Sequence, residues 1–331
     1  MTTALKYVKI GHVCISLTDF YESDKEAAMS LLQAILMGII QGLTEFLPVS
    51  SSGHLALFKI LFHVETDTGM LFDVLLHVGT LIAICVVYYR DILRMIVEGL
   101  CIIRDAFLNV AAFFRNVFLK CRYGRKSDHE IDYSPYRRIV NSSYRKFVML
   151  VIVSTIPTGI IGYIGKDVVE MASEILIVPG ICLIVTAILL FIADHVRGGD
   201  KLPKDITYSN AFFIGIAQGV ATLPGLSRSG TTITACLLSG FNRKFAVKYS
   251  FIMSIPAVLG AMVLELKDFT AVSLSGAEIF SYIIGMIIAA LIGYICIKTM
   301  LVIVRKKKFR IFAIYCLIVG IISIGGFFYT L

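Results

Sequence analysis

Two stretches of the chain, 177 residues apart, carry the same interrupted pattern. Residues 33–54 read QAILMGIIQGLTEFLPVSSSGH, and residues 210–231 read NAFFIGIAQGVATLPGLSRSGT. Aligned without a gap, 8 of the 20 positions from 34 to 53 are identical in the second copy. Each copy is an apolar run that is broken by Pro or Gly and then followed by Ser-x-Ser-Gly. Matching breaks in two halves of a chain are typical of membrane proteins whose functional site lies near the bilayer midplane.

The composition also indicates a membrane protein. Of the 331 residues, 57% are hydrophobic and 16% are charged, and the mean hydropathy is +0.84. Several apolar segments of about 20 residues explain these values better than a soluble domain does. The net charge of +8 follows the membrane topology described below and does not indicate a nucleic acid partner. The eight cysteines are scattered without a CxxC pair, which is typical of buried apolar side chains.

Six segments are apolar and long enough to span a bilayer: about 71–89, 147–165, 174–193, 249–266, 278–304 and 310–331. Two others, about 30–62 and 208–240, are broken in the middle, and each half is too short to cross. We predict re-entrant helix hairpins there, because irregular backbone at membrane depth is tolerated where it is buried in protein or lines a wet cavity. The expected fold is an all-α polytopic membrane protein with a tail at 1–29 and one integral membrane domain at 30–331.

Lys and Arg are distributed unequally between two sets of connections. One set holds 23 of them: 90–146, 194–206, 241–248 and 305–310. The other set holds five: 1–29, 63–70, 166–173 and 267–277. The positive-inside rule places the first set in the cytoplasm. The first hairpin then enters the membrane from outside and the second from inside, which predicts an inverted-topology repeat.

The basic connection 90–146 is unusually long. Its stretch 98–119 (EGLCIIRDAFLNVAAFFRNVFL) mixes apolar residues with Arg104, Asp105 and Arg115. We predict an amphipathic helix at the membrane interface rather than a further span. The basic residues that follow favour simple positive-inside anchoring, with attraction to anionic lipid as the alternative.

The second copy of the pattern offers an anion site. Arg228 lies in PGLSRSGTT and is the one charged residue between 208 and 240. Its planar, permanently charged fork suits phosphate, although an Arg that only stabilises a helix break is the alternative. Neighbouring hydroxyl and backbone N–H groups can surround the same anion. These candidate phosphate-binding residues are Ser227, Ser229, Gly230 and Thr232.

The first copy carries different chemistry. Glu45 lies near the end of a helical run with Gln41 one turn earlier on the same face, so the pair can hold a divalent cation through oxygen ligands. Glu45 can instead be a base, or pair with an arginine for stability. Ser51 belongs to a cluster of three serines with His54 just beyond. This suits a serine nucleophile with a histidine base, and helix capping is the alternative for each serine.

Asp73 and His77 are four residues apart in FDVLLHVGT, near the outer end of a span. A helix places both on one face. They can support the site or line the substrate entrance, although a pair at the membrane interface is the simpler interpretation.

Together, QGLTEFLPVSSSGH and PGLSRSGTT closely resemble the paired signatures of the undecaprenyl-pyrophosphate phosphatases, also called the bacitracin-resistance family. The resemblance covers about residues 30–331. It implies hydrolysis of undecaprenyl pyrophosphate to undecaprenyl phosphate and inorganic phosphate, which recycles the lipid carrier of cell-wall synthesis and gives bacitracin tolerance. It also implies a bacterial plasma membrane location and an active site that opens to the outer face.

The resemblance further implies catalytic residues and a cofactor. Glu45, Ser51, His54 and Arg228 fall on the catalytic positions of the family, which uses a divalent cation, magnesium or calcium. Gln41 falls where many members have Glu, which puts in doubt any mechanism that needs two carboxylates as metal ligands. The implied partners are undecaprenyl pyrophosphate and membrane lipids. The oligomeric state, including a homo-oligomer, is left open.

A secondary transporter or a flippase for a lipid phosphate, built on the same inverted repeat, is the alternative function. Such a protein needs coupling-ion sites but no nucleophile and base. The grouping of Ser51, His54 and Glu45 beside an anion-binding loop favours the enzyme. The sequence leaves open whether a serine or a water attacks.

Overall fold

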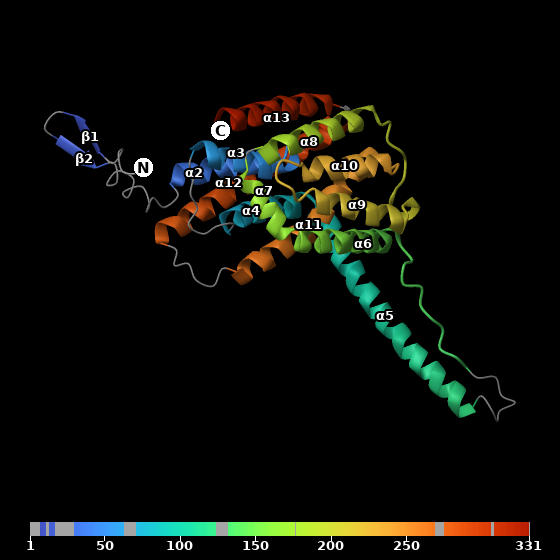
Figure 1. Cartoon of the computed structure of the whole chain (residues 1–331). Coiled ribbons are helices and arrows are strands. Elements are labelled where there is room, and N and C mark those ends of the chain that lie inside the picture. Colours follow the sequence, from blue (N-terminus) through green and yellow to red (C-terminus); the bar gives the residue numbers. More distant parts are fainter. Residues whose placement is uncertain are drawn as a thin grey trace.

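The computed structural model describes residues 7–10, 13–16, 30–62, 71–123, 132–175, 177–268, 275–305 and 308–330. These form a bundle of helices from which one long helix projects (Figure 1). The tail contributes a small antiparallel hairpin, β1 (Tyr7–Ile10) and β2 (Val13–Ser16). The sequence did not predict this hairpin in the tail, since strands of four residues are too short for their alternation to stand out. All other described elements are helical, which confirms the predicted all-α membrane fold.

The spans and hairpins follow the predicted order, and two further helical elements, residues 166–174 and 203–205, lie in predicted connections. In the first half of the chain they are α2 (Leu31–Phe46), α3 (Ser51–Phe62), α4 (Leu71–Val87), α5 (Tyr89–Tyr123), α6 (Ser143–Ile164), α7 (Lys166–Glu174) and α8 (Ile177–His195). In the second half they are the 3-10 turn η1 (Pro203–Asp205), α9 (Tyr208–Val220), α10 (Arg228–Leu238), α11 (Arg243–Asp268), α12 (Gly276–Arg305) and α13 (Arg310–Thr330).

The spanning segments agree with the prediction. Among the described residues, α6, α8, α11, α12 and α13 are each long and apolar enough to cross a membrane. The sixth is α4, which has 17 residues and passes the same test together with α5. Apolar side chains lie on the outside of the bundle, where Ile181, Ile188, Leu291 and Ile322 are at least half exposed. Such a surface suits hydrocarbon rather than water, so the chain is a multi-pass membrane protein.

Both interrupted segments form helix hairpins. The four helices α2, α3, α9 and α10 have 16, 12, 13 and 11 residues. The longest reaches about 24 Å, which is less than the ~30 Å of hydrocarbon. Each connecting loop contains one residue with positive φ, Ser50 at 69° and Gly225 at 89°. The chain therefore reverses sharply between the two helices of each hairpin.

The two hairpins pack on opposite halves of the chain in the same way: α2 lies along α12, and α9 lies along α6. A Cβ added to Gly38 would lie 2.5 Å from the carbonyl oxygen of Gly285, and one added to Gly215 would lie 2.2 Å from that of Ser154. Gly38 and Gly215 occupy equal positions in the twin pattern. These glycines therefore allow close backbone contact between helices. Each hairpin packs on a helix from the other half of the chain, as a two-fold repeat requires.

A methyl group at this contact is expected to destabilise the fold. In Gly215→Ala the new Cβ would meet backbone and the Pro157 ring, neither of which can swing aside, so overpacking should cost about 1–3 kcal/mol. Gly159→Ala in α6 is the matched control, because nothing lies within 4 Å of its added Cβ. Thermal unfolding in detergent measures the difference. Equal midpoints for the two variants would contradict the close contact.

The stretch 98–119 is helical, as predicted, and belongs to the 35-residue α5. This helix is bent by 88° from α4 and projects beyond the bundle (Figure 1).

Candidate active site

The loops of the two hairpins meet inside the bundle. A Cβ added to Gly53 would lie 2.8 Å from the Cα of Gly225, so no side chain fits between the loops at this point. Glu45, at the end of α2, forms an ion pair with Arg228, the first residue of α10. The twin motifs are therefore brought together across 183 residues of sequence, and Glu45 is the counter-charge of Arg228.

The Glu45 carboxylate is the centre of the site. One oxygen accepts a hydrogen bond from Arg228. The other accepts from the Ser51 hydroxyl at 2.6 Å and from Nε2 of Gln41 at 3.1 Å. The Glu45 side chain is only 9% exposed, and a charge so far from water requires such partners. The arrangement holds a nucleophile candidate, a proton acceptor and a cationic anion-binding group within direct contact.

A small pocket opens beside this carboxylate. Its lining residues come from both hairpins and from α11: Glu45, Phe46, Arg228, Ser229, Ser250, Phe251 and Ser254. A guanidinium and several hydroxyls facing one space can bind phosphate oxygens. The pocket therefore has the chemistry of an anion site next to a buried carboxylate.

The predicted phosphate-binding residues divide into two groups. Ser229 lines the pocket with Arg228. Ser227 accepts a hydrogen bond from the backbone N–H of Gly230 at 3.1 Å, which is the N-cap interaction that begins α10. The Thr232 hydroxyl lies 2.5 Å from that of Ser250. Ser227, Gly230 and Thr232 thus shape the loop in this structure, while Arg228 and Ser229 face the pocket.

His54 lies at the site but does not contact Ser51 as a base would. Its Nδ1 is 2.7 Å from the carbonyl oxygen of Ser50, and its Nε2 is 2.8 Å from the hydroxyl of Tyr315 in α13. The two rings stack with centroids 5.6 Å apart. The hydrogen-bond acceptor of the Ser51 hydroxyl is Glu45 instead. Nothing in the local sequence around His54 indicates Tyr315, which lies 261 residues away.

Of the pair in α4, His77 belongs to the site and Asp73 does not. Nδ1 of His77 is 2.9 Å from Nε2 of Gln41 and 3.5 Å from a Glu45 oxygen. Asp73 accepts a hydrogen bond from Lys59 at 2.6 Å. The spacing of four residues was a usable signal, but it could not tell which of the two side chains turns inward.

Gln41 is held so that its carbonyl oxygen is free. Its Nε2 is within hydrogen-bond distance of both Glu45 and His77, whereas its buried Oε1 has no partner among the residues that the structure describes. An amide oxygen beside a carboxylate suits magnesium or calcium, and magnesium is commonly held by one or two carboxylates together with substrate phosphates. In the described part of the chain no group of three or more His, Cys, Asp or Glu residues could hold a metal. The donors present therefore fit a cation that the substrate helps to bind.

Comparison with known proteins covers nearly the whole chain. The family model described as Bacitracin resistance protein BacA matches residues 34–322. The chain is 38% identical over 296 residues to the undecaprenyl-diphosphatase of Methanosphaera stadtmanae, which covers 89% of this chain and 98% of that protein. It is 40% identical, with the same coverage, to the undecaprenyl-diphosphatase of Alkaliphilus metalliredigens. It is also 40% identical over 299 residues to that of Methanobrevibacter smithii, covering 90% and 98%. The family match includes the first hairpin from residue 34 onward and the whole of the second, and the chain belongs to the family of bacitracin resistance protein BacA.

Proposed function

We propose that the protein hydrolyses undecaprenyl pyrophosphate to undecaprenyl phosphate and inorganic phosphate. The observation that carries the proposal is the shared Glu45 carboxylate, which contacts Arg228 from one hairpin and Ser51 from the other. The names of the relatives supply the substrate. The location of the site between membrane helices suits a substrate whose lipid chain stays in the bilayer.

The contacts support a phosphoryl transfer in which each residue has a defined part. Arg228 and Ser229 bind the terminal phosphate, and the guanidinium offsets charge that spreads over its oxygens in the transition state. The Ser51 hydroxyl passes its proton to Glu45 as its oxygen attacks the terminal phosphorus. The bond to the bridging oxygen breaks and releases undecaprenyl phosphate, and water then hydrolyses the phosphoserine. A water that occupies the place of the attacking hydroxyl and is activated by Glu45 gives the same products in one step.

A divalent cation, magnesium or calcium, completes the proposal, with Gln41 and Glu45 as its protein ligands. When bound, such a cation neutralises phosphate charge and helps to orient the substrate. The support is the free buried Oε1 of Gln41 beside the carboxylate. His77 positions this amide, because it accepts a hydrogen bond on the NH₂ side and leaves the oxygen side open.

Removing the acceptor at position 77 is therefore expected to weaken cation binding. His77→Phe keeps a ring but removes one of the two acceptors that orient the Gln41 amide. The half-saturating magnesium concentration should therefore rise on the order of 10-fold, as for other residues that orient metal ligands. Magnesium-dependent thermal stabilisation of the purified protein gives a readout besides turnover. Asp73→Asn, one turn away on the same helix, is the control. An unchanged magnesium response in His77→Phe would remove His77 from the cation site.

The site is proposed to open to the outer face, with the two hairpins entering the membrane from opposite sides. The distribution of Lys and Arg supports this orientation. In a background without native cysteines, Asp67→Cys is expected to react with an impermeant thiol reagent in intact cells. Lys244→Cys should react only after permeabilisation. Identical labelling of both variants would overturn the inverted repeat.

Phosphate release from undecaprenyl pyrophosphate by the purified protein tests the function. We expect release that requires magnesium or calcium and stops on chelation. If the folded protein releases no phosphate but moves the lipid phosphate between leaflets of reconstituted vesicles, the alternative transporter would replace the enzyme.

A further inference from the structure

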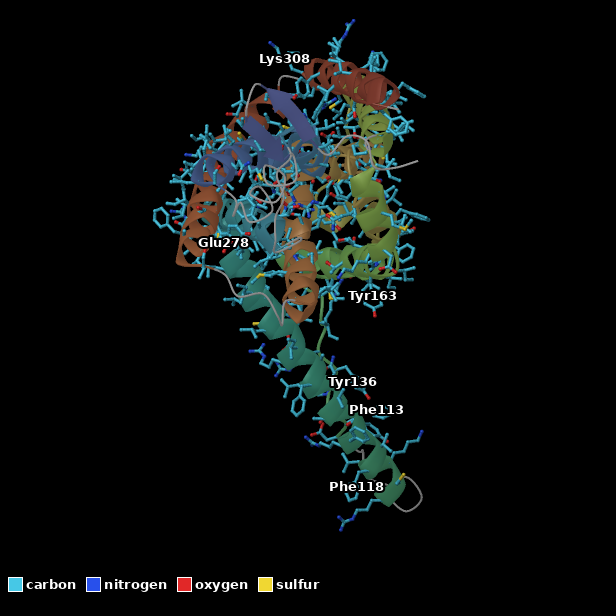
Figure 2. The ribbon with its side chains drawn as sticks, turned by 60° about the vertical axis from the view of Figure 1, so that its left-hand side comes forward. Phe113, Phe118, Tyr136, Tyr163, Glu278 and Lys308 are labelled. Carbon is cyan, nitrogen blue, oxygen red and sulfur yellow. The ribbon has the colours of Figure 1, made fainter. Side chains whose placement is uncertain are left out.

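One face of α5 is an exposed apolar stripe. Its largest members recur at helical spacing and are between 58% and 72% exposed: Leu93, Leu100, Ile103, Phe107, Phe114 and Phe118. At about 100° per residue these positions fall on one side of the helix. Figure 2 shows the projecting part of α5, with Phe113 and Phe118 labelled, extending away from the bundle. A stripe of this size requires a cover that the bundle does not supply.

The opposite face of α5 is covered by the chain itself. Residues 132–141, here called the return segment, run back along the helix (Figure 1). Asn109 donates to the carbonyl oxygen of Arg137 at 2.8 Å and accepts from its N–H at 2.7 Å. Asn116, two turns further, makes the same pair of bonds with Ser134 at 3.0 and 2.8 Å. The two asparagines fasten the return segment as a neighbouring strand would, so this face, here called the closed face, is occupied by the chain itself.

The acidic residues of α5 also lie on the covered face and are paired. Asp91 binds Lys248 of α11. Glu98 and Asp105 bind the buried Arg145 at 2.9 and 2.8 Å. These ion pairs fix the rotation of α5 about its own axis relative to the bundle. Because all three acidic residues of α5 lie on the covered face, the apolar stripe carries no acidic side chain.

Arginines border the stripe on its outer side. Arg90, Arg115 and Arg122 are exposed and fall within a narrow sector beside the apolar residues at helical spacing. Arg104 lies in the same sector and pairs with Asp105 at 3.0 Å. The helix is therefore divided into a closed acidic face, an open apolar face and a basic edge. An apolar face with an arginine border is complementary to a bilayer surface that carries negative phosphates.

We propose that α5 docks on the cytoplasmic surface of the membrane, with its apolar stripe among the acyl chains and its arginine edge on anionic lipid phosphates. The bend of 88° from the spanning α4 supports this orientation, because a helix perpendicular to a span runs along the surface. The Lys and Arg count places the same connection in the cytoplasm. The closed face then points to the cytosol.

The absence of tryptophan from the chain allows a direct test. A single tryptophan is introduced by Phe107→Trp on the stripe or, as the matched control, by Tyr136→Trp on the return segment, where Tyr136 is also exposed. The full-length protein is reconstituted in nanodiscs of phosphatidylcholine with phosphatidylglycerol. We expect blue-shifted emission in the Phe107→Trp variant that is quenched by lipids brominated on their acyl chains. The Tyr136→Trp variant should emit as in water and resist this quenching.

Two results would overturn the proposal. Emission of the Phe107→Trp variant at the wavelength found in water would show that the stripe does not enter lipid. A blue shift without quenching by brominated lipid would show that protein, such as a second copy of this chain, covers the stripe.

A separate experiment tests the role of lipid charge. Quenching should fall when phosphatidylglycerol is omitted or when Arg115→Glu is added, and equal quenching in all three cases would refute the role of anionic lipid.

Discussion

Arg228→Ala is expected to abolish phosphate release, by a factor on the order of 10³ or more, as for other arginines that bind a transferring phosphoryl group. Arg228→Lys should not restore turnover, since an ammonium cannot reproduce the planar fork that engages two oxygens at once. Initial rates of phosphate release from undecaprenyl pyrophosphate measure both variants. Near-normal turnover of a well-folded Arg228→Lys protein would remove Arg228 as the phosphate ligand.

Loss of Arg228 also leaves the Glu45 carboxylate buried without its cation, and an unpaired buried charge destabilises a fold strongly. The double variant Arg228→Ala with Glu45→Gln removes that charge. It is expected to recover the thermal midpoint lost by Arg228→Ala without recovering activity. Recovery of the midpoint would show that the lost stability comes from the unpaired charge, whereas activity stays absent in either case because Glu45 is also the proton acceptor. The test of phosphate binding is therefore Arg228→Lys, which keeps a cation beside Glu45.

Ser51→Ala is expected to lower kcat by about 100-fold or more, the order typical of losing a nucleophile or proton-transfer group. The reason is the 2.6 Å hydrogen bond from its hydroxyl to Glu45, which joins the attacking group to its proton acceptor. Ser52→Ala is the matched control. The Ser52 hydroxyl lies 3.4 Å from that of Ser50, and the structure gives it no contact with Glu45, so its loss should change kcat little.

The two possible nucleophiles give different results with the same variants. If Ser51 attacks, rapid quenching should trap a phosphorylated protein in the parent chain and none in Ser51→Ala. If Ser51→Ala raises KM while kcat stays the same, Ser51 binds the substrate and water attacks.

His54→Ala provides a further comparison. Because His54 contacts Tyr315, a fall in kcat shared by His54→Ala and Tyr315→Phe would assign both to proton transfer on the other side of the site.

The sequence by itself was sufficient for the membrane architecture. Hydropathy identified the six spans, and the Pro, Gly and Ser breaks identified both hairpins. These signals are local: whether a segment can cross the bilayer depends on its own length and polarity, and a helix break depends on residues within one turn. The twin pattern also identified Glu45 and Arg228 as candidate site residues, because each lies near the break of one copy.

Only the tertiary structure decided which polar groups meet. Ser51 bonds to Glu45 although His54 is nearer in sequence, His77 turns inward while Asp73 pairs with Lys59, and the partner of His54 is Tyr315. Each choice depends on how far a helix is rotated about its axis. That rotation is set by packing against helices more than a hundred residues away, such as the contact of Gly38 with Gly285. Residue spacing determines which side chains share a face, and the packing of distant helices determines what that face meets.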